Sequence, residues 1–300
     1  MSSELQLDLV ESPSEARPDE ESTDGWALTG SLRRFVHNPP GVAGACVVVA
    51  IGLAAAIGPS FAPDPNLADV IHKLAPPSGA HLLGTDDLGR DMLARLLAGA
   101  RVALIVSIGS TAIGIAFAMV LGVAAGYFGG SLDELLSRVF DVIVTFPMIL
   151  LAVLIVVALG PSLTAVCIAI GFVVIPRYGR QFRVLTKACV QREYVQAVMA
   201  QGYSSVRVIA RHVLPNIVLP IAVVAAGNMG RLAVAEASLS FLGAGVQPPN
   251  ASWGNMISDG QQYLQTDPGV ALYPGIALCI LAIAFSFVGD ALRDAFDLTE

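Results

Sequence analysis

Six long apolar runs that contain few or no charged residues constrain the fold of this 300-residue chain more than any other feature. They cover about residues 42–61, 102–125, 139–159, 163–174, 217–242 and 270–288. A helix of about 20 apolar residues crosses the hydrocarbon core of a bilayer. Only 14% of the residues are charged, against roughly 25% in an ordinary globular domain. The pattern predicts an all-α, polytopic membrane protein with six transmembrane helices, and it excludes a soluble enzyme.

Residues 1–28 differ from the rest of the chain. They are acidic, rich in Ser and Pro, and without apolar periodicity, which predicts a disordered cytoplasmic tail. A secretory signal peptide would instead begin with a basic stretch and a short apolar run. We therefore divide the chain into this tail, an N-terminal anchor helix with an extracytoplasmic segment (29–99), and a transmembrane domain (100–298) with a cytoplasmic loop at 191–215.

The distribution of Lys and Arg predicts the orientation, because cytoplasmic loops are enriched in these residues. Seven of them fall between the fourth and fifth runs, and none falls in the loop at 243–269. This places the basic loop and both termini in the cytoplasm and the chain in the cell membrane.

The stretch from 192 to 215 has a helix–glycine–helix pattern. Gly202 suits the left-handed residue that closes a helix, and Ser204 or its neighbour can cap a second one. Leu214-Pro215 would then break the chain before it re-enters the membrane. We expect a compact knob on the cytoplasmic face; a hairpin that merely joins two spans is the simpler alternative.

The stretch at 83–101 predicts an amphipathic helix along the outer interface, capped by Thr85 or Asp86. Its apolar stripe would consist of Leu88, Met92, Leu93, Leu96 and Leu97, with ion pairs between Asp87 and Arg90 and between Asp91 and Arg95. The clustered aspartates could also suggest a metal or catalytic site. A helix cap and ion pairs explain them more simply.

Three stretches of the chain carry a family resemblance. The knob resembles the signature of permease subunits in binding-protein-dependent ABC importers, with Gly202, Leu214 and Pro215 in register, Ala197 matching, and Gln196 where the family has Glu. The stretches at 83–101 and 236–256 are similar to the C-type subunits of the dipeptide, oligopeptide and nickel branch. Together the resemblance covers about residues 29–298 and implies the type I ABC importer permease fold.

The resemblance implies a function and a set of partners. The chain would form half of the translocation pathway of an ATP-driven importer of di- or oligopeptides, or of nickel or a nickel chelate. Its partners would be a homologous B-type permease, two cytoplasmic ATPase subunits, an extracytoplasmic solute-binding protein and the lipid bilayer, with no nucleic acid. The chain has no phosphate-binding Gly-x-x-x-x-Gly-Lys-Ser/Thr loop. We therefore expect no enzyme activity and no cofactor in it, with ATP and magnesium bound by the partners.

Two charged residues lie inside the fifth run, Arg231 and Glu236. Each costs roughly 2.5–3.5 kcal/mol near a helix centre on insertion scales, so such residues usually face a bundle interior or water. They are candidates for the translocation pathway, where they would meet the charged ends of a peptide. Pairing with another helix for assembly is the alternative. A secondary transporter, which would need no ATPase and would often show internal repeats, is a less favoured alternative for the whole chain.

Overall fold

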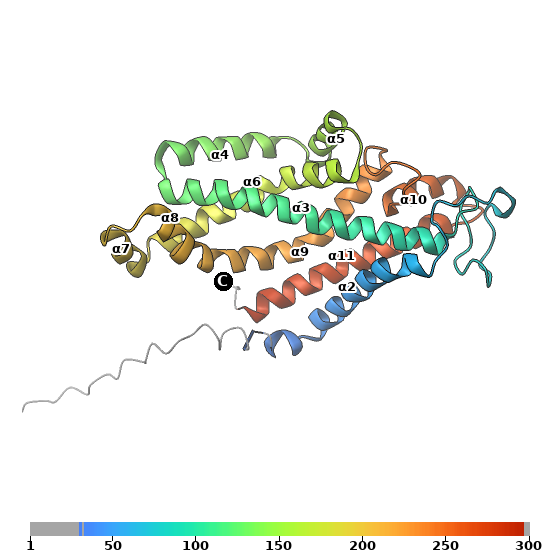
Figure 1. Cartoon of the computed structure of the whole chain (residues 1–300), viewed down its shortest axis with the longest axis horizontal. Coiled ribbons are helices and arrows are strands. Elements are labelled where there is room, and N and C mark those ends of the chain that lie inside the picture. The colour runs from blue at the N-terminus through green and yellow to red at the C-terminus, as the bar shows by residue number, and fades with distance from the viewer. Residues whose placement is uncertain (1–29, 32, 297–300) are drawn as a thin grey trace, which may run out of the picture.

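The computed structural model describes residues 30–31 and 33–296, so the predicted tail lies outside the described residues. Five helical stretches are long and apolar enough to cross a membrane, and they run along the length of the molecule (Figure 1). They are α2 (Pro39–Ile57) with the short turn after it, α3 (Met92–Phe128), α6 (Leu163–Val190), α9 (Leu214–Phe241) with the turns before it, and α11 (Gly269–Ala295). The all-α membrane fold predicted from the apolar runs is confirmed.

The third predicted span is not one straight helix. It consists of α4 (Gly130–Thr145) and α5 (Met148–Leu159), which meet at an angle of 94°. Phe146 is extended (φ −81°, ψ 136°) immediately before Pro147, as expected for a residue whose α conformation is hindered by the proline ring that follows. The prediction of a continuous span over 139–159 is therefore wrong, and we call this bend the α4–α5 elbow.

The fourth predicted span is too short. Helix α6 continues to Val190, because buried side chains recur at helical spacing beyond the apolar run: Tyr178, Phe182, Thr186 and Cys189. Four of the seven basic residues assigned to the loop therefore lie on this helix. The basic loop itself begins only after Val190.

Helices α3 and α6 approach each other closely along glycine residues. A Cβ on Gly126 would lie 2.6 Å from the Arg183 carbonyl oxygen, and one on Gly114 would lie 3.1 Å from the Gly171 carbonyl oxygen. Small residues allow backbones to pack at this distance within a membrane. One hydrophobic core lies between α3, α6 and α9, and a second one lies between α2, α3, α10 (Trp253–Gly260) and α11.

The segment at 58–91 and α10 form one end of the molecule, opposite α7 (Glu193–Ala200) (Figure 1). No helix begins at Thr85 or Asp86. Gly84 and Gly89 have positive φ, which bends the chain, and Asp91 caps α3 by accepting a hydrogen bond from the Ala94 N–H at 2.8 Å. The predicted interfacial helix is therefore the first part of α3 itself.

The charges of the 58–91 segment pair differently from the prediction. The Asp87–Arg90 pair is present at 3.6 Å, but Arg95 pairs with Asp86 at 3.2 Å rather than with Asp91. Asp86 also binds Arg90 at 2.6 Å, and all of these groups except Asp87 are buried. No metal-binding group of His, Cys, Asp and Glu occurs among the described residues. Ion pairs that fasten this segment to α3 account for the aspartates.

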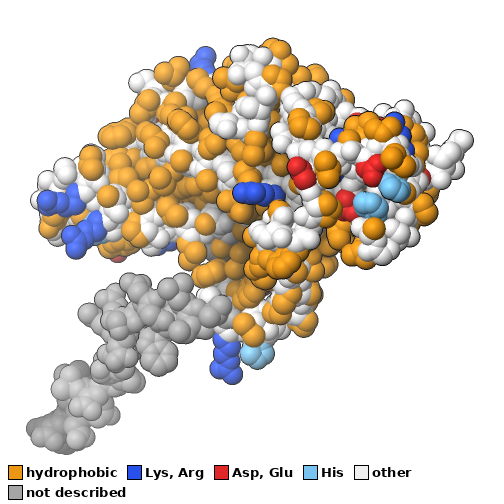
Figure 2. Space-filling model, turned by 45° about the vertical axis from the view of Figure 1, so that its right-hand side comes forward, with side chains coloured by type: hydrophobic (Ala, Val, Ile, Leu, Met, Phe, Trp, Pro, Cys, Tyr) orange, Lys and Arg blue, Asp and Glu red, His pale blue; other side chains and the backbone are white. Residues whose placement is uncertain are grey.

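Hydrophobic side chains cover most of the face seen in Figure 2, and acidic side chains gather near the 58–91 segment and α10. This distribution matches an apolar membrane-facing belt with polar ends.

Candidate functional site

The knob at 191–215 is built on three valines. Val195, Val208 and Val213 are fully buried and join the core between α3, α6 and α9. Gly202 has a φ of +80° between α7 and α8 (Ser205–Val208), as predicted, and a side chain there would meet open space. Gln196 and Ala197 are exposed on α7, opposite its buried side. The knob therefore presents α7 outward while its apolar side anchors it to the bundle.

Leu214 and Pro215 do not break the chain. A π-helical turn (Ile209–Val213) connects α8 to α9, and the Leu214 N–H bonds to the Ile209 carbonyl five residues back. Proline lacks an N–H and its ring would press on the preceding turn of a regular α-helix, and the wider turn accommodates it. The predicted break is wrong, because a continuous helical path from Ser205 to Phe241 joins the knob directly to a membrane span.

Polar contacts that the sequence did not reveal hold the knob to α9. The Asn216 side-chain amide donates to the His212 carbonyl at 2.7 Å and to the Tyr194 hydroxyl at 3.1 Å. Tyr194 lies on α7 and Asn216 on α9. Movement of α7 is thereby tied to the start of α9.

Ion pairs also connect α6, which leads into the knob, to α4. Asp133 near the start of α4 binds both Arg183 and Lys187 of α6, the latter at 2.6 Å. Asp141 binds Arg180 at 2.7 Å further along the same two helices. These contacts fasten α4, and with it the elbow, to the helix that carries the knob.

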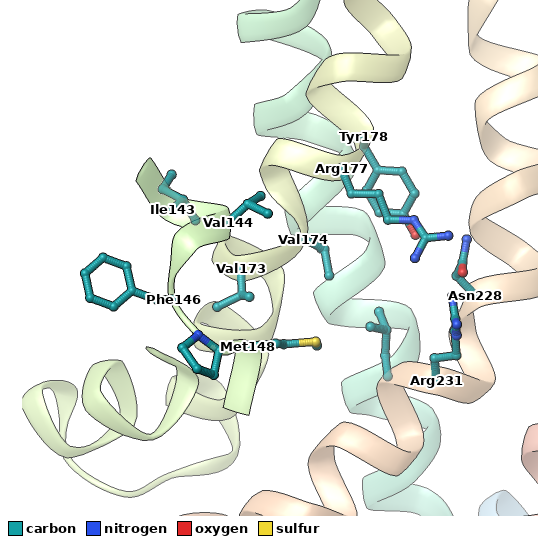
Figure 3. Close-up of a pocket in the computed structure, with 12 residues that line it drawn as sticks. Ile143, Val144, Phe146, Met148, Val173, Val174, Arg177, Tyr178, Asn228 and Arg231 are labelled. Carbon is teal, nitrogen blue, oxygen red and sulfur yellow. The ribbon is translucent and has the colours of Figure 1, made fainter. Parts of the chain in front are cut away.

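A hollow of about 560 Å³ opens between the elbow, α6 and α9 (Figure 3). Its apolar wall includes Ile143, Val144, Phe146, Pro147, Met148, Val173, Val174 and Leu232. Its polar wall consists of Arg177 and Tyr178 from α6 and Asn228 and Arg231 from α9. In Figure 3 the Arg177 side chain extends from α6 toward α9, where Asn228 and Arg231 lie.

A second hollow of about 280 Å³ shares Arg177, Asn228 and Arg231 with the first. It continues along α11, which adds Asp290 and Arg293. The three shared residues therefore stand where the two hollows meet.

The two charged residues predicted as pathway candidates occupy different environments. Arg231 is exposed and lines both hollows. Glu236 is completely buried and lines neither; its carboxylate accepts a hydrogen bond from the Ser240 hydroxyl at 2.7 Å. The same hydroxyl accepts from the Val246 N–H at 3.2 Å, so Glu236 packs against the loop after α9. The structure does not bring Arg231 and Glu236 together.

The sequence did not single out Arg177 or Asn228. Arg177 lies beyond the predicted fourth span, which ends at Val174, and Asn228 is an uncharged residue in an apolar run. The i, i+3 spacing of Arg177, Arg180 and Arg183 is a helical signal that could have identified the continuation of α6.

Comparisons with known proteins agree with this architecture. Residues 118–298 match the family model described as the inner membrane component of binding-protein-dependent transport systems, and residues 27–77 match the N-terminal transmembrane domain of oligopeptide transport permease C.

Similar curated proteins carry peptide and nickel transport names. The dipeptide transport system permease DppC of Alkalihalophilus pseudofirmus is 35% identical over 96% of this chain and 95% of its own. The probable D,D-dipeptide permease DdpC of Escherichia coli is 34% identical over 96% and 97%. The nickel permease NikC of Escherichia coli is 40% identical over 78% and 84%.

A solved structure shares the fold. It is a chain of the MetNI methionine ABC transporter in an inward-facing conformation, with a TM-score of 0.55, 22% identity, and coverage of 70% of this chain and 98% of that one. The family match over most of the membrane domain and the full-length relatives lead to one conclusion: this chain belongs to the inner membrane components of binding-protein-dependent transport systems, as a C-type permease of the ABC importer branch that contains peptide and nickel permeases.

Proposed function

We propose that this chain forms half of the translocation pathway of an ATP-driven importer of di- or oligopeptides. The observation that carries the proposal is the hollow between the elbow, α6 and α9, into which Arg231 and Arg177 project from largely apolar helices. Charged groups at such positions usually face a bundle interior or a water-filled cavity. A hollow with polar groups on one wall needs a second protein wall, because polar groups left against lipid are costly.

The partner assignments come from the family to which the chain belongs, and the same features suggest where each partner would bind. A homologous B-type permease would close the hollow, and a solute-binding protein would deliver the peptide at the α10 end. Two ATPase subunits would bind the exposed side of α7 and, with ATP and magnesium, drive the cycle. Through Gly202 and the continuous path into α9, their movement would reach the wall that carries Arg231.

The proposed orientation places the knob in the cytoplasm. Arg192, Arg207 and Arg211 lie at the knob, whereas residues 243–269 contain no Lys or Arg. The start of α2 and the end of α11 lie together, since the Asn38 amide donates to the Asp294 carboxylate at 3.4 Å. Both ends of the described chain point toward the α7 side (Figure 1), which supports cytoplasmic termini.

The test is reconstitution with the products of the neighbouring genes. The chain should co-purify with a second permease and ATPases, and the complex in liposomes with its binding protein should import labelled dialanine only with ATP. Uptake by this chain alone, or uptake driven by an ion gradient without ATPases, would refute the proposal.

Nickel is the second candidate cargo, because the nickel permease NikC is 40% identical to this chain. Mass and metal analysis of the ligand that co-purifies with the binding protein separates the two. A bound peptide supports the first candidate, and bound nickel without peptide supports the second.

A further inference from the structure

The charges that face the two hollows are strongly biased in sign. Arg177, Arg231 and Arg293 line them, and Asp290 is the single carboxylate on their walls. All four side chains are exposed, and none forms an ion pair within residues 30–31 and 33–296. The larger hollow carries two arginines and no acid. This wall favours anionic groups over cations.

Arg177 differs in this respect from the other basic residues on α6. Arg180, Arg183 and Lys187 of α6 are each engaged by an aspartate of α4. Arg177 is one helical turn away from this series, and it faces the hollow instead. Intramembrane guanidinium groups are retained where they meet a cavity or a partner charge. We therefore expect the group that pairs with the guanidinium groups of Arg177 and Arg231 to belong to the substrate that enters the hollow.

The geometry brings the two guanidinium groups to one place. Arg177 reaches across from α6, and Asn228 and Arg231 lie on successive turns of the same stretch of α9 (Figure 3). The Asn228 amide nitrogen donates to the Val224 carbonyl at 2.7 Å, which leaves a second N–H and the amide oxygen available. Guanidinium groups bind carboxylates through paired N–H donors.

We propose that Arg177 and Arg231, with Asn228 between them, bind the free carboxylate of the transported peptide. The inference rests on the proposed peptide-import function and names the chemical group that this wall recognises. The net positive wall also disfavours a bare divalent cation as cargo, because like charges repel across a weakly screened cavity.

The experiment compares ATP-driven uptake of labelled dialanine and dialanine amide by the reconstituted complex. The amide lacks the carboxylate and is otherwise nearly the same size. We expect the wild-type complex to prefer dialanine by about 10-fold to 100-fold, the value of hydrogen bonds to a charged group. Arg177→Gln and Arg231→Gln should each lower this preference about 10-fold, mainly by slowing dialanine uptake.

Matched variants separate recognition from assembly. Arg180→Gln lies on the same helix but lines neither hollow, so it should keep the wild-type preference for dialanine. If Arg231→Gln does not assemble, Arg231→Lys retains the charge and should assemble with a reduced preference, since Lys lacks the paired donors.

The outcomes are distinct. An unchanged preference in assembled Arg177→Gln and Arg231→Gln complexes, or an equal loss in Arg180→Gln, overturns the carboxylate site and leaves peptide import standing. A wild-type complex that imports Ni²⁺ and neither peptide overturns the proposed function and, with it, this site.

Discussion

Replacement of Gly202 by valine tests whether the knob transmits movement. Gly202 has a φ of +80°, and no atom lies within 4 Å of a Cβ built there. The substitution therefore meets no neighbour, and its whole cost is backbone strain, about 1–3 kcal/mol for a residue held in a sparsely populated conformation. A β-branched residue belongs at the upper end of this range. The strain should shift the turn out of the left-handed region and change the direction of α7 relative to α8.

A strain of this size corresponds to about a 5-fold to 150-fold weaker association of the ATPases, if the altered turn no longer presents α7 correctly. The assay measures co-purified ATPase and peptide-dependent ATP hydrolysis in the reconstituted complex. The chain should remain in the membrane and bound to its partner permease. Gly202→Asn, which tolerates positive φ, should retain most of the coupling. Normal peptide-dependent hydrolysis in Gly202→Val would refute the knob as the transmission element.

Two further predictions concern stability. Gly126→Ala should destabilise the bundle by about 1–3 kcal/mol through overpacking, because its Cβ would lie 2.6 Å from the Arg183 carbonyl oxygen. Gly109→Ala on the same helix meets only the Cys167 side chain, whose sulfur is the nearest atom at 3.4 Å, and should be tolerated. Equal thermal unfolding of both variants in detergent would contradict this packing. Burial, with the Asp87 carboxylate nearby, raises the pKa of Asp259 above its ordinary value, although Arg95 and Arg90 act in the opposite direction. The folded state thus loses stability as pH rises through that raised pKa. Asp259→Asn should therefore increase Tm at pH 7, with the gain vanishing toward pH 4; a gain independent of pH would show another cause.

The features that the sequence predicted correctly depend on the chemistry of single residues or of short stretches of the chain. Apolar runs have to lie in the bilayer, so the membrane class and the approximate positions of the spans follow from composition along the chain. The left-handed turn at Gly202 follows from a property of a single residue, its lack of a Cβ. The sequence also singled out Arg231 and Glu236, because a charge is conspicuous in an apolar run; their place in the pathway was a prediction.

The remaining features depend on contacts between distant residues. The bend at Pro147 and the extension of α6 past Val174 are stabilised by packing and by pairs such as Asp133 with Arg183, fifty residues apart. Asp86 forms its ion pairs with Arg90 and Arg95 because Gly84 and Gly89, which have positive φ, fold the chain back before α3 begins. Arg177 and Arg231 share one hollow only because α6 and α9 lie beside the elbow, whereas Glu236, five residues beyond Arg231, is buried against a loop. Spacing along one helix gives the direction of a side chain, but the neighbouring helices decide whether that direction leads to a cavity or to the core.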